Sequence, residues 1–342
     1  MNPLLDKLQP YPFERLKSLV ADITPASAFK AISFGIGEPK HPTPQFIKEA
    51  LIEGLGGLSN YPATAGGEPL RAVDYMGGDS GIVQGARVSY GKGTRSTSDD
   101  RGLIRYLMRH RHTSPFELAV LKLHVRAPIF VTRQWFRHRT ASINEYSARY
   151  SVLEKEFYFP RPEDIAAQST NNKQGRADTL PPEQAQQVLD ILRDDASRCY
   201  DHYLDLLNED ENGEKRDPDR PAIARELARM NLPVNIMTQF YWQINLWNLL
   251  HFLRLRADSH AQYEIRAYAD AILQIVQKWA PLTYEAFTDY MRDAVLLSGP
   301  ALKVLRAAMG GQPVDPAQAG LSKREIRELA EMFPEIAPRL AR

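Results

Sequence analysis

One stretch of the chain combines cationic and hydrogen-bonding side chains with almost no aliphatic ones. Residues 137–150 read Arg-His-Arg-Thr-Ala-Ser-Ile-Asn-Glu-Tyr-Ser-Ala-Arg-Tyr, and Arg133 and Gln134 lie just upstream. A guanidinium can hold a phosphate through two parallel, charge-assisted hydrogen bonds. A surface salt-bridge loop would need acidic residues between the arginines, and only Glu145 is present. The stretch therefore predicts a binding site for a phosphate-bearing ligand.

Other reactive residue types give weaker signals. The cluster Arg256-Ala-Asp-Ser-His-Ala-Gln262, taken alone, also fits a capping arrangement between an arginine and an aspartate at a helix start. The single cysteine, Cys199, falls on the apolar face of a predicted helix, which favours a core position over a nucleophile. Ser147 shows no triad pattern, so we expect it to hydrogen-bond a ligand. His112 and His138 lack carboxylate partners at ligand spacing, and we predict no metal site.

Regular elements must position these residues. Leu121, Leu123 and Val125 alternate with polar residues, which predicts a strand within residues 117–126, and a second strand is predicted over residues 82–90. Helices are predicted after Asp99-Asp100, after Pro181-Pro182, from Pro221, over residues 240–255 and through residues 265–275.

Two of these helices carry specific expectations. In the helix from Pro221, Arg225 and Arg229 are four positions apart and share a face. The buried face of the helix after Pro182 is expected to consist of Val188, Ile191, Leu192, Cys199 and Tyr203.

Composition limits the classes of function. The 342 residues suffice for about two domains with a sizeable core. Lys plus Arg is 43 and Asp plus Glu is 42, so no overall charge attracts nucleic acid or an anionic membrane. One cysteine indicates a reducing compartment, and no apolar run approaches the roughly 18 residues of a membrane span. The first residues lack the layout of a secretory signal, and we expect a cytoplasmic protein.

The first seventy residues differ in character from the rest. Ile32 to Pro39, Asn60-Tyr-Pro62 and Gly66-Gly-Glu-Pro-Leu-Arg71 resemble the opening of the pyridoxal-phosphate aminotransferases, in particular those acting on succinyldiaminopimelate and related precursors. Nothing downstream supplies the remaining coenzyme domain or a Schiff-base lysine. We expect residues 1–70 to be a fragment without a complete fold of its own and without transaminase activity.

From Val73 to about Glu328 the sequence resembles the flavin-dependent thymidylate synthases. Arg137-His-Arg139, followed by seven residues and then Ser147, matches that family's signature, and Arg256 to Gln262 matches its second hallmark. Further matching segments are Ala86-Arg-Val-Ser-Tyr90, Asp100 to Met108, Pro115-Phe-Glu117 and Leu321-Ser-Lys-Arg-Glu325. The resemblance implies an α+β fold with a central, mostly antiparallel sheet flanked by helices. It also implies a homotetramer, and it predicts a synthase domain over residues 71–330 and a tail over residues 331–342.

The activity implied by the resemblance is the reductive methylation of dUMP to dTMP. Methylenetetrahydrofolate would donate the carbon, and NADPH would reduce a bound FAD that supplies hydride. The family uses no enzymic cysteine to activate uracil, in agreement with the expected position of Cys199. The resemblance makes Arg256 the catalytic residue, because a fixed cation beside the N3/O2 edge of the pyrimidine stabilises the negative charge that develops there.

The resemblance also assigns residues to the two ligands, with the active site shared between subunits. In that arrangement Arg225 and Arg229 need no acidic partner from their own chain. Trp247 departs from the polar or basic side chain of many members, and its contact would be by backbone or stacking. The dUMP-binding residues are Gln134, Trp135, Phe136, Arg137, Glu145, Tyr146, Ser147, Ala148, Arg149, Arg229 and Arg256. The FAD-binding residues are Ser114, Arg137, His138, Arg139, Glu145, Asn245, Trp247 and His251, with Ser89 and His112 as weaker candidates.

Three alternatives remain open at this stage. An aminotransferase is supported only by residues 1–70, and a pyridoxal-phosphate absorption band would favour it. An RNA-binding module would use the arginines, but the net charge is near zero and aromatic-and-glycine RNA motifs are absent from the sequence. The third alternative is an inactive fusion that retains the synthase core.

The join between the two parts gives a first prediction. Family members begin with a short strand ahead of the Val73 to Gly77 segment, and here aminotransferase-like sequence stands in its place. Losing an edge strand exposes sheet backbone, so we expect an active protein of reduced stability. The full chain and a chain beginning near Leu70 should differ in melting temperature and in the fraction of tetramer measured by light scattering. Equal values would show that the added segment is neutral.

Overall fold

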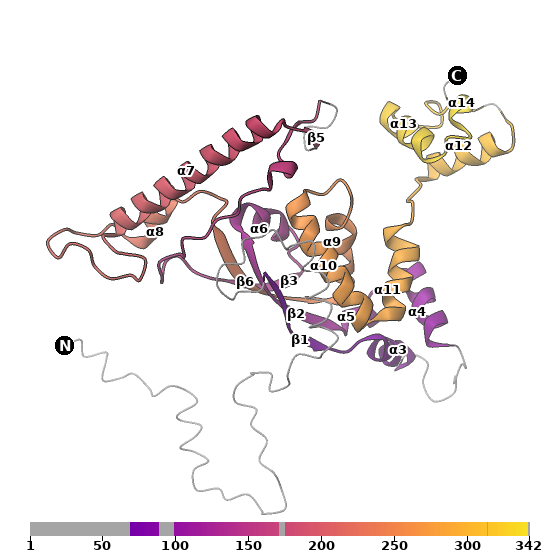
Figure 1. The fold of residues 1–342 in the computed structure, drawn as a ribbon. Helices are drawn as coiled ribbons and strands as arrows, with labels where there is room; N and C mark the ends of the chain where they lie inside the picture. Colours follow the sequence, from indigo (N-terminus) through magenta and orange to yellow (C-terminus); the bar gives the residue numbers. More distant parts are fainter. Residues whose placement is uncertain (1–68, 89–98, 171–174, 313, 341–342) are drawn as a thin grey trace, which may run out of the picture. The chain divides into compact units, whose positions relative to one another are not determined.

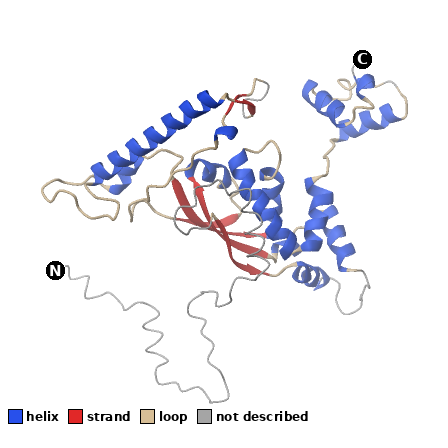
Figure 2. Ribbon diagram, in the orientation of Figure 1, coloured by secondary structure: helices blue, strands red, loops and turns tan. Residues whose placement is uncertain are grey.

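A four-stranded antiparallel sheet forms the centre of the computed structural model, which describes residues 69–88, 99–170, 175–312 and 314–340 (Figures 1 and 2). The order of its strands is β1-β2-β6-β3, and each neighbouring pair is antiparallel. These strands are β1 Leu70–Met76, β2 Val120–Pro128, β3 Ala141–Glu145 and β6 Met237–Asn245, and a separate hairpin pairs β4 Ala166–Gln168 with β5 Arg176–Thr179. The expected α+β class with an antiparallel sheet is confirmed, whereas the aminotransferase-like residues 1–68 lie outside the described residues.

Helices make up most of the remaining described chain. The α-helices are α3 Asp79–Arg87, α4 Asp100–Arg109, α5 Ser114–Glu117, α6 Ile129–Trp135, α7 Pro182–Leu207, α8 Arg225–Ala228, α9 Leu246–Arg256, α10 Tyr263–Trp279, α11 Pro281–Phe287, α12 Gly299–Met309, α13 Lys323–Met332 and α14 Ala337–Leu340. Short 3₁₀ turns cover Pro162–Asp164 and Arg229–Asn231, and a π-helical turn covers Thr288–Arg292. Among the described helices, none is long and apolar enough to cross a membrane.

One face of the sheet forms the main hydrophobic core. Leu121, Leu123 and Val125 of β2 are fully buried, as the alternation in the sequence predicts. Trp242 on β6 belongs to the same face, and the ring of Trp135 on α6 packs at 5.3 Å from it. Helices α6, α9 and α10 cover this face, as Figure 1 shows. Burial of large aromatic and aliphatic side chains therefore fixes the position of α6 and α9 against the sheet.

The predicted helix over residues 240–255 is wrong in its first part. Residues 240–245 belong to strand β6, and the helix α9 begins only at Leu246. Phe240, Trp242 and Ile244 are buried while Tyr241 between them is exposed, which is the period-two pattern of a strand. Aromatic residues and leucines occur throughout the segment, so its composition does not reveal where the strand period of two changes to the helical period of 3.6.

The predicted strand over residues 82–90 is a helix where it is described. Ile82, Val83 and Ala86 form the buried face of α3, and Ser89 lies outside the described residues. The carboxylate of Asp79 at the start of α3 accepts hydrogen bonds from the backbone of residues 282 and 283 at the start of α11. This tertiary contact outweighs the preference of β-branched residues for strands.

Two further expectations need correction. Helix α7 forms as predicted and Tyr203 is buried as expected, but Ile191 is 61% exposed and Leu192 is also exposed. The buried face contains Leu189 and Tyr200 in their place. The helix expected from Pro221 is reduced to α8 and one 3₁₀ turn.

Strand β1, the first described strand of the chain, forms one edge of the sheet. Strand β1 begins at Leu70, ahead of Val73, and pairs with β2 along its whole length apart from one irregularity after Ala72. This strand contains Val73 itself, and most of the segment ahead of it lies outside the described residues, so the expected replacement of a preceding strand stays a prediction. At the other end of the chain, α12, α13 and α14 bury a hydrophobic cluster of their own, and α13 crosses the predicted domain limit at residue 330.

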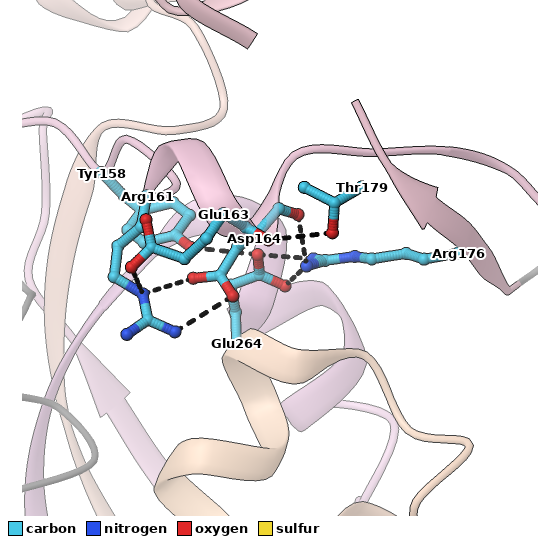
Figure 3. A network of polar contacts seen from close by, with 7 residues as sticks. All are labelled: Tyr158, Arg161, Glu163, Asp164, Arg176, Thr179 and Glu264. Atoms are coloured by element: carbon cyan, nitrogen blue, oxygen red, sulfur yellow. Dashed lines mark hydrogen bonds and ion pairs between the residues drawn. The ribbon is translucent and has the colours of Figure 1, made fainter. Parts of the chain in front are cut away.

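A buried carboxylate ties the β4–β5 hairpin to the start of α10 (Figure 3). Glu264 is 2% exposed and accepts hydrogen bonds from the hydroxyl of Tyr158 at 3.0 Å and from Arg176 Nη2 at 2.6 and 2.7 Å. Arg161 forms a second pair with Asp164 at 2.6 Å in the same network. The hydrogen bonds of Glu264 hold the first turn of α10, which directly follows residues 256–262.

The Glu264 network gives a stability prediction. In Arg176→Ala the buried carboxylate loses its counter-charge, and the free energy of unfolding in urea should fall by on the order of 3 kcal/mol. Adding Glu264→Gln should recover part of this loss, because an amide needs no counter-charge. The matched control is Arg198→Ala, which breaks only exposed ion pairs on α7 and should change stability by less than about 1 kcal/mol. Equal losses in the two single variants would refute the predicted role.

Candidate functional site

The segment between α9 and α10 places the second arginine cluster. Asn245 begins α9 by accepting a hydrogen bond from the backbone of Asn248 at 3.0 Å, and Arg256 is the last residue of that helix. Asp258 accepts from both the backbone and the Nδ1 atom of His260 at 2.8 Å. Asp258 therefore hydrogen-bonds to His260 and not to Arg256. The capping arrangement considered from the sequence is wrong, and the guanidinium of Arg256 can bind another partner.

Arg256 donates a hydrogen bond to a buried histidine. Its Nε lies 3.1 Å from Nε2 of His138, a residue that is only 8% exposed. Because Nε2 accepts this bond, the neutral ring of His138 carries its proton on Nδ1. Burial, followed by the positive charges of Arg256 and His251, lowers the pKa of His138 to about 4. Burial also lowers the pKa of Arg256, which still remains a cation at neutral pH.

Gln134 joins the two arginine clusters. Its backbone oxygen accepts a hydrogen bond from Arg256 Nη2 at 3.3 Å, and its side-chain amide donates to the side chain of Gln262. The first cluster is thereby fixed to both ends of the segment 256–262. Nη1 of Arg256 has no hydrogen-bond partner in the part of the chain that the structure describes, and it is available to a ligand.

Two of the predicted flavin residues lie on α9, and a third precedes it. Trp247 and His251 are on the helix, Asn245 is the residue just before it, and the ring of His251 lies 5.8 Å from that of His138. Trp247 and His251 line a cleft of about 580 Å³. The remaining lining consists of Met108, Arg109, Arg111, Asn248, Arg254, Tyr290, Met291, Ala294, Val295 and Leu296.

Three arginines of the first cluster have no acidic partner among the described residues. Arg133, Arg137 and Arg139 are exposed, and no described carboxylate forms an ion pair with any of them. Positive charges that repel one another at a protein surface favour an anionic ligand over an empty site. Side chains of this type hold phosphate oxygens bidentately.

A second group of predicted residues gathers at the far end of β3. Glu145 accepts a hydrogen bond from Thr238 at 3.0 Å, and Ser147 Oγ accepts one from the backbone of Arg149 at 3.3 Å. Arg149 pairs with Glu226 at 3.4 Å. Tyr146 and Arg229 are exposed, and the small side chain of Ala148 is buried.

The expectation for Arg225 is wrong. Arg225 donates to Glu209 at 2.7 Å and to the backbone oxygen of Tyr150 at 2.9 Å, so it has an acidic partner in its own chain. It holds the segment after β3 in place instead of facing a ligand. Arg229 forms no ion pair with the described residues.

Two of the predicted flavin residues are separated along the sheet. Glu145 is paired with Phe240 on β6, whereas Asn245 is five residues further along the same strand. At about 3.3 Å per residue this is a distance of roughly 17 Å. Glu145 and Asn245, both predicted flavin residues, are therefore far apart within a single chain. Phe136, next to Arg137, packs at 5.1 Å from Phe240 and so lies at the Glu145 end of this strand.

Two predicted nucleotide contacts are unsuited to that role by their side chains. Trp135 is fully buried among Phe240, Trp242 and Phe252, and Phe136 is half-buried against Phe240. Their apolar neighbours show that these rings support the core beneath the arginines.

The flavin candidate Ser114 and the weaker candidate His112 lie on or just before α5, and the cleft contains residues that the sequence did not suggest. Ser114 starts the short helix α5 and is exposed, and the exposed ring of His112 lies 5.8 Å from Tyr106. The cleft brings Arg109, Arg111, Arg254 and Tyr290 to the same place as Trp247 and His251. The Arg-His-Arg-His sequence of residues 109–112, without acidic neighbours, was the available signal.

Comparisons with known proteins identify the family of this chain. The family described as thymidylate synthase complementing protein matches residues 71–282. The flavin-dependent thymidylate synthase of Rickettsia bellii (strain RML369-C) is 56% identical over 265 residues, which is 77% of this chain and 90% of that protein. That of Gluconobacter oxydans (strain 621H) is 56% identical over 264 residues, covering 77% and 84% of the two chains.

A solved structure shows the same fold. The UMP/dUMP methylase PolB from Streptomyces cacaoi, bound with 5-Br UMP, is 37% identical, with a TM-score of 0.56, over 65% of this chain and 95% of that one. The sequence match over most of the described sheet and helices, together with this structural similarity, is decisive. The chain belongs to the family of flavin-dependent thymidylate synthases.

Proposed function

We propose that the protein methylates dUMP reductively to dTMP, with FAD as bound cofactor, NADPH as reductant and methylenetetrahydrofolate as carbon donor. The observation that carries the proposal is Arg256, a half-buried cation held by His138 and Gln134 with one nitrogen left for a ligand. The relatives are named flavin-dependent thymidylate synthases, and the structural neighbour is a UMP/dUMP methylase.

Arg256 is proposed as the catalytic residue. Placed at the N3/O2 edge of uracil, its guanidinium stabilises the negative charge that develops on the ring, so that the ring carbon becomes nucleophilic without a cysteine. The hydrogen bond to His138 fixes the guanidinium plane before the nucleotide arrives, which reduces the reorganisation that the reaction requires. Cys199 is half-buried on α7, and Ser147 is bonded to a backbone amide, so neither provides an activated nucleophile.

The residues present fit a dinucleotide cofactor. Arg137 and Arg139 are cationic, exposed and without an acidic partner among the described residues, which suits the phosphates of FAD. The neutral ring of His138 and the side chains of Asn245 and His251 offer hydrogen-bonding groups without negative charge. When bound, FAD supplies the hydride. The chain's own residues hold the ligands, orient Arg256 and keep His138 neutral.

A complete site would need a second copy of the chain. Arg149 and Arg229 belong to one group and Arg256 to the other, and no hydrogen bond or ion pair among the described residues joins the two groups of arginines. We propose that a homotetramer brings the group at the end of β3 in one subunit to the Arg256 group of another. Residues 1–70 are proposed to contribute nothing to this site.

Substituting Arg256 tests the catalytic proposal. In Arg256→Ala, dTMP formation should fall by roughly 100-fold or more, because the developing charge loses its fixed cation. Arg256→Lys should recover little, since a lysine cannot donate to His138 and the nucleotide in the same plane. Product formation and the flavin absorption spectrum are measured together, with Arg198→Ala as the surface control. Retained dTMP synthesis in Arg256→Ala would refute the role, whereas absence of flavin from the parent protein would refute the proposed function itself.

The low pKa of His138 predicts a pH dependence of stability. The unfolded chain binds a proton on this histidine below about pH 6.5, and the folded chain binds it only near pH 4. Unfolding therefore takes up a proton between these values. Stability is fully present above pH 6.5 and falls toward pH 4 by on the order of 3 kcal/mol. His138→Gln, whose amide oxygen can still accept from Arg256, should flatten this part of the curve of melting temperature against pH. An unchanged slope would contradict the assignment.

A further inference from the structure

Three arginines line the cleft beside α9, and no role has yet been assigned to them. We propose that Arg109, Arg111 and Arg254 bind the phosphates of an adenine nucleotide carried by one of the dinucleotides of the proposed reaction. The inference rests on the proposed function for the identity of those dinucleotides. The flavin residues implied by the sequence, Trp247 and His251, account for only part of the cleft lining.

The charge of the cleft supports an anionic ligand. Every ionisable side chain in its lining is an arginine, a histidine or a tyrosine. Neither Arg109, Arg111 nor Arg254 forms an ion pair with any carboxylate in the described ranges. Arg105 differs from these three, because it forms ion pairs with Asp289 at 2.6 Å and with Glu285 at 3.0 Å. Three unpaired cations at a cleft of about 580 Å³ provide the charge and the room for a nucleotide's phosphates.

The backbone at Arg111 gives an independent argument. Helix α4 ends in two hydrogen bonds, from Arg111 N to Met108 O at 3.1 Å and from His112 N to Leu107 O at 2.9 Å. This motif places Arg111 in the left-handed region with φ of 57°. Glycine adopts that conformation without steric conflict, whereas an arginine is strained there. A strained residue whose side chain lines a cleft indicates that the side chain itself is needed.

Aromatic and apolar side chains complete a nucleotide-like environment. Trp247 packs against Phe116 at a ring distance of 5.8 Å, and the guanidinium of Arg105 lies 5.0 Å from the ring centre of Tyr290. Both rings are thus supported from outside the cleft and can contact a flat base. His251 lines the cleft and also lies beside His138. A ligand in the cleft would therefore adjoin the Arg256 pair.

The experiment compares affinity and stability in the same variants. ADP and adenosine 2′,5′-bisphosphate are titrated calorimetrically into the full-length parent protein and into Arg111→Gly and Arg254→Gln, with Arg198→Gln as control. We expect nucleotide binding to be at least tenfold weaker in both cleft variants and unchanged in the control. Arg111→Gly should in addition melt a few degrees higher, because the left-handed position is relieved. A purely structural role for Arg111 would raise the melting temperature without changing affinity, and that result would overturn the inference.

Two further readouts identify the dinucleotide. Loss of bound flavin from Arg111→Gly and Arg254→Gln would show that the cleft holds the phosphates of FAD. Retained flavin with a raised KM for NADPH and an unchanged kcat would show that it holds the phosphates of the reductant, and both outcomes support the inference. Undiminished affinity for both nucleotides in both variants would refute it. If the parent protein binds the nucleotides through these arginines but forms no dTMP, the proposed function fails while the cleft assignment stands.

Discussion

The hydrogen bond between Arg256 and His138 constrains most of the candidate site. This hydrogen bond requires a neutral imidazole on His138 and a guanidinium on Arg256 that is not paired with a carboxylate. His138 is buried, which meets the first condition. The second condition is met because Asp258 accepts its hydrogen bond from His260 and not from Arg256. Gln134 then connects this pair to α6, so the packing of α6 on the sheet becomes part of the orientation of Arg256. Core packing and chemistry are coupled through one polar contact.

Local sequence patterns predicted the parts of this arrangement that depend on local physics. The alternation of Leu121, Leu123 and Val125 predicted β2. The anion site inferred from the arginine-rich segment stays a prediction, and the structure joins Gln134 of that segment to Arg256 by a hydrogen bond. Tertiary contacts decided the rest. Asp79 binds the start of α11 and keeps α3 helical, which no short window of sequence reveals. In residues 240–245 the aromatic residues suit either period, and pairing with two neighbouring strands selected the strand.

The site residues show the same division. Residue types identified which side chains carry charge, but they could not show that Arg225 is paired with Glu209 while Arg229 has no such partner among the described residues. Nor could they show that the turn after α4 brings Arg111 to the same cleft as Arg254, more than a hundred residues away in the chain. Such contacts depend on how the helices pack, which is a property of the whole core.

The uncompensated arginines have a consequence for the lifetime of the protein. Guanidinium groups gathered without acidic neighbours repel one another in the folded chain and separate when it unfolds. Ions that screen this repulsion, and ligands that neutralise it, both favour the folded state, the latter in proportion to the logarithm of their concentration. The nucleotide supply of a cell would then regulate the amount of intact enzyme as well as its rate, because unliganded chains would be the first to be degraded.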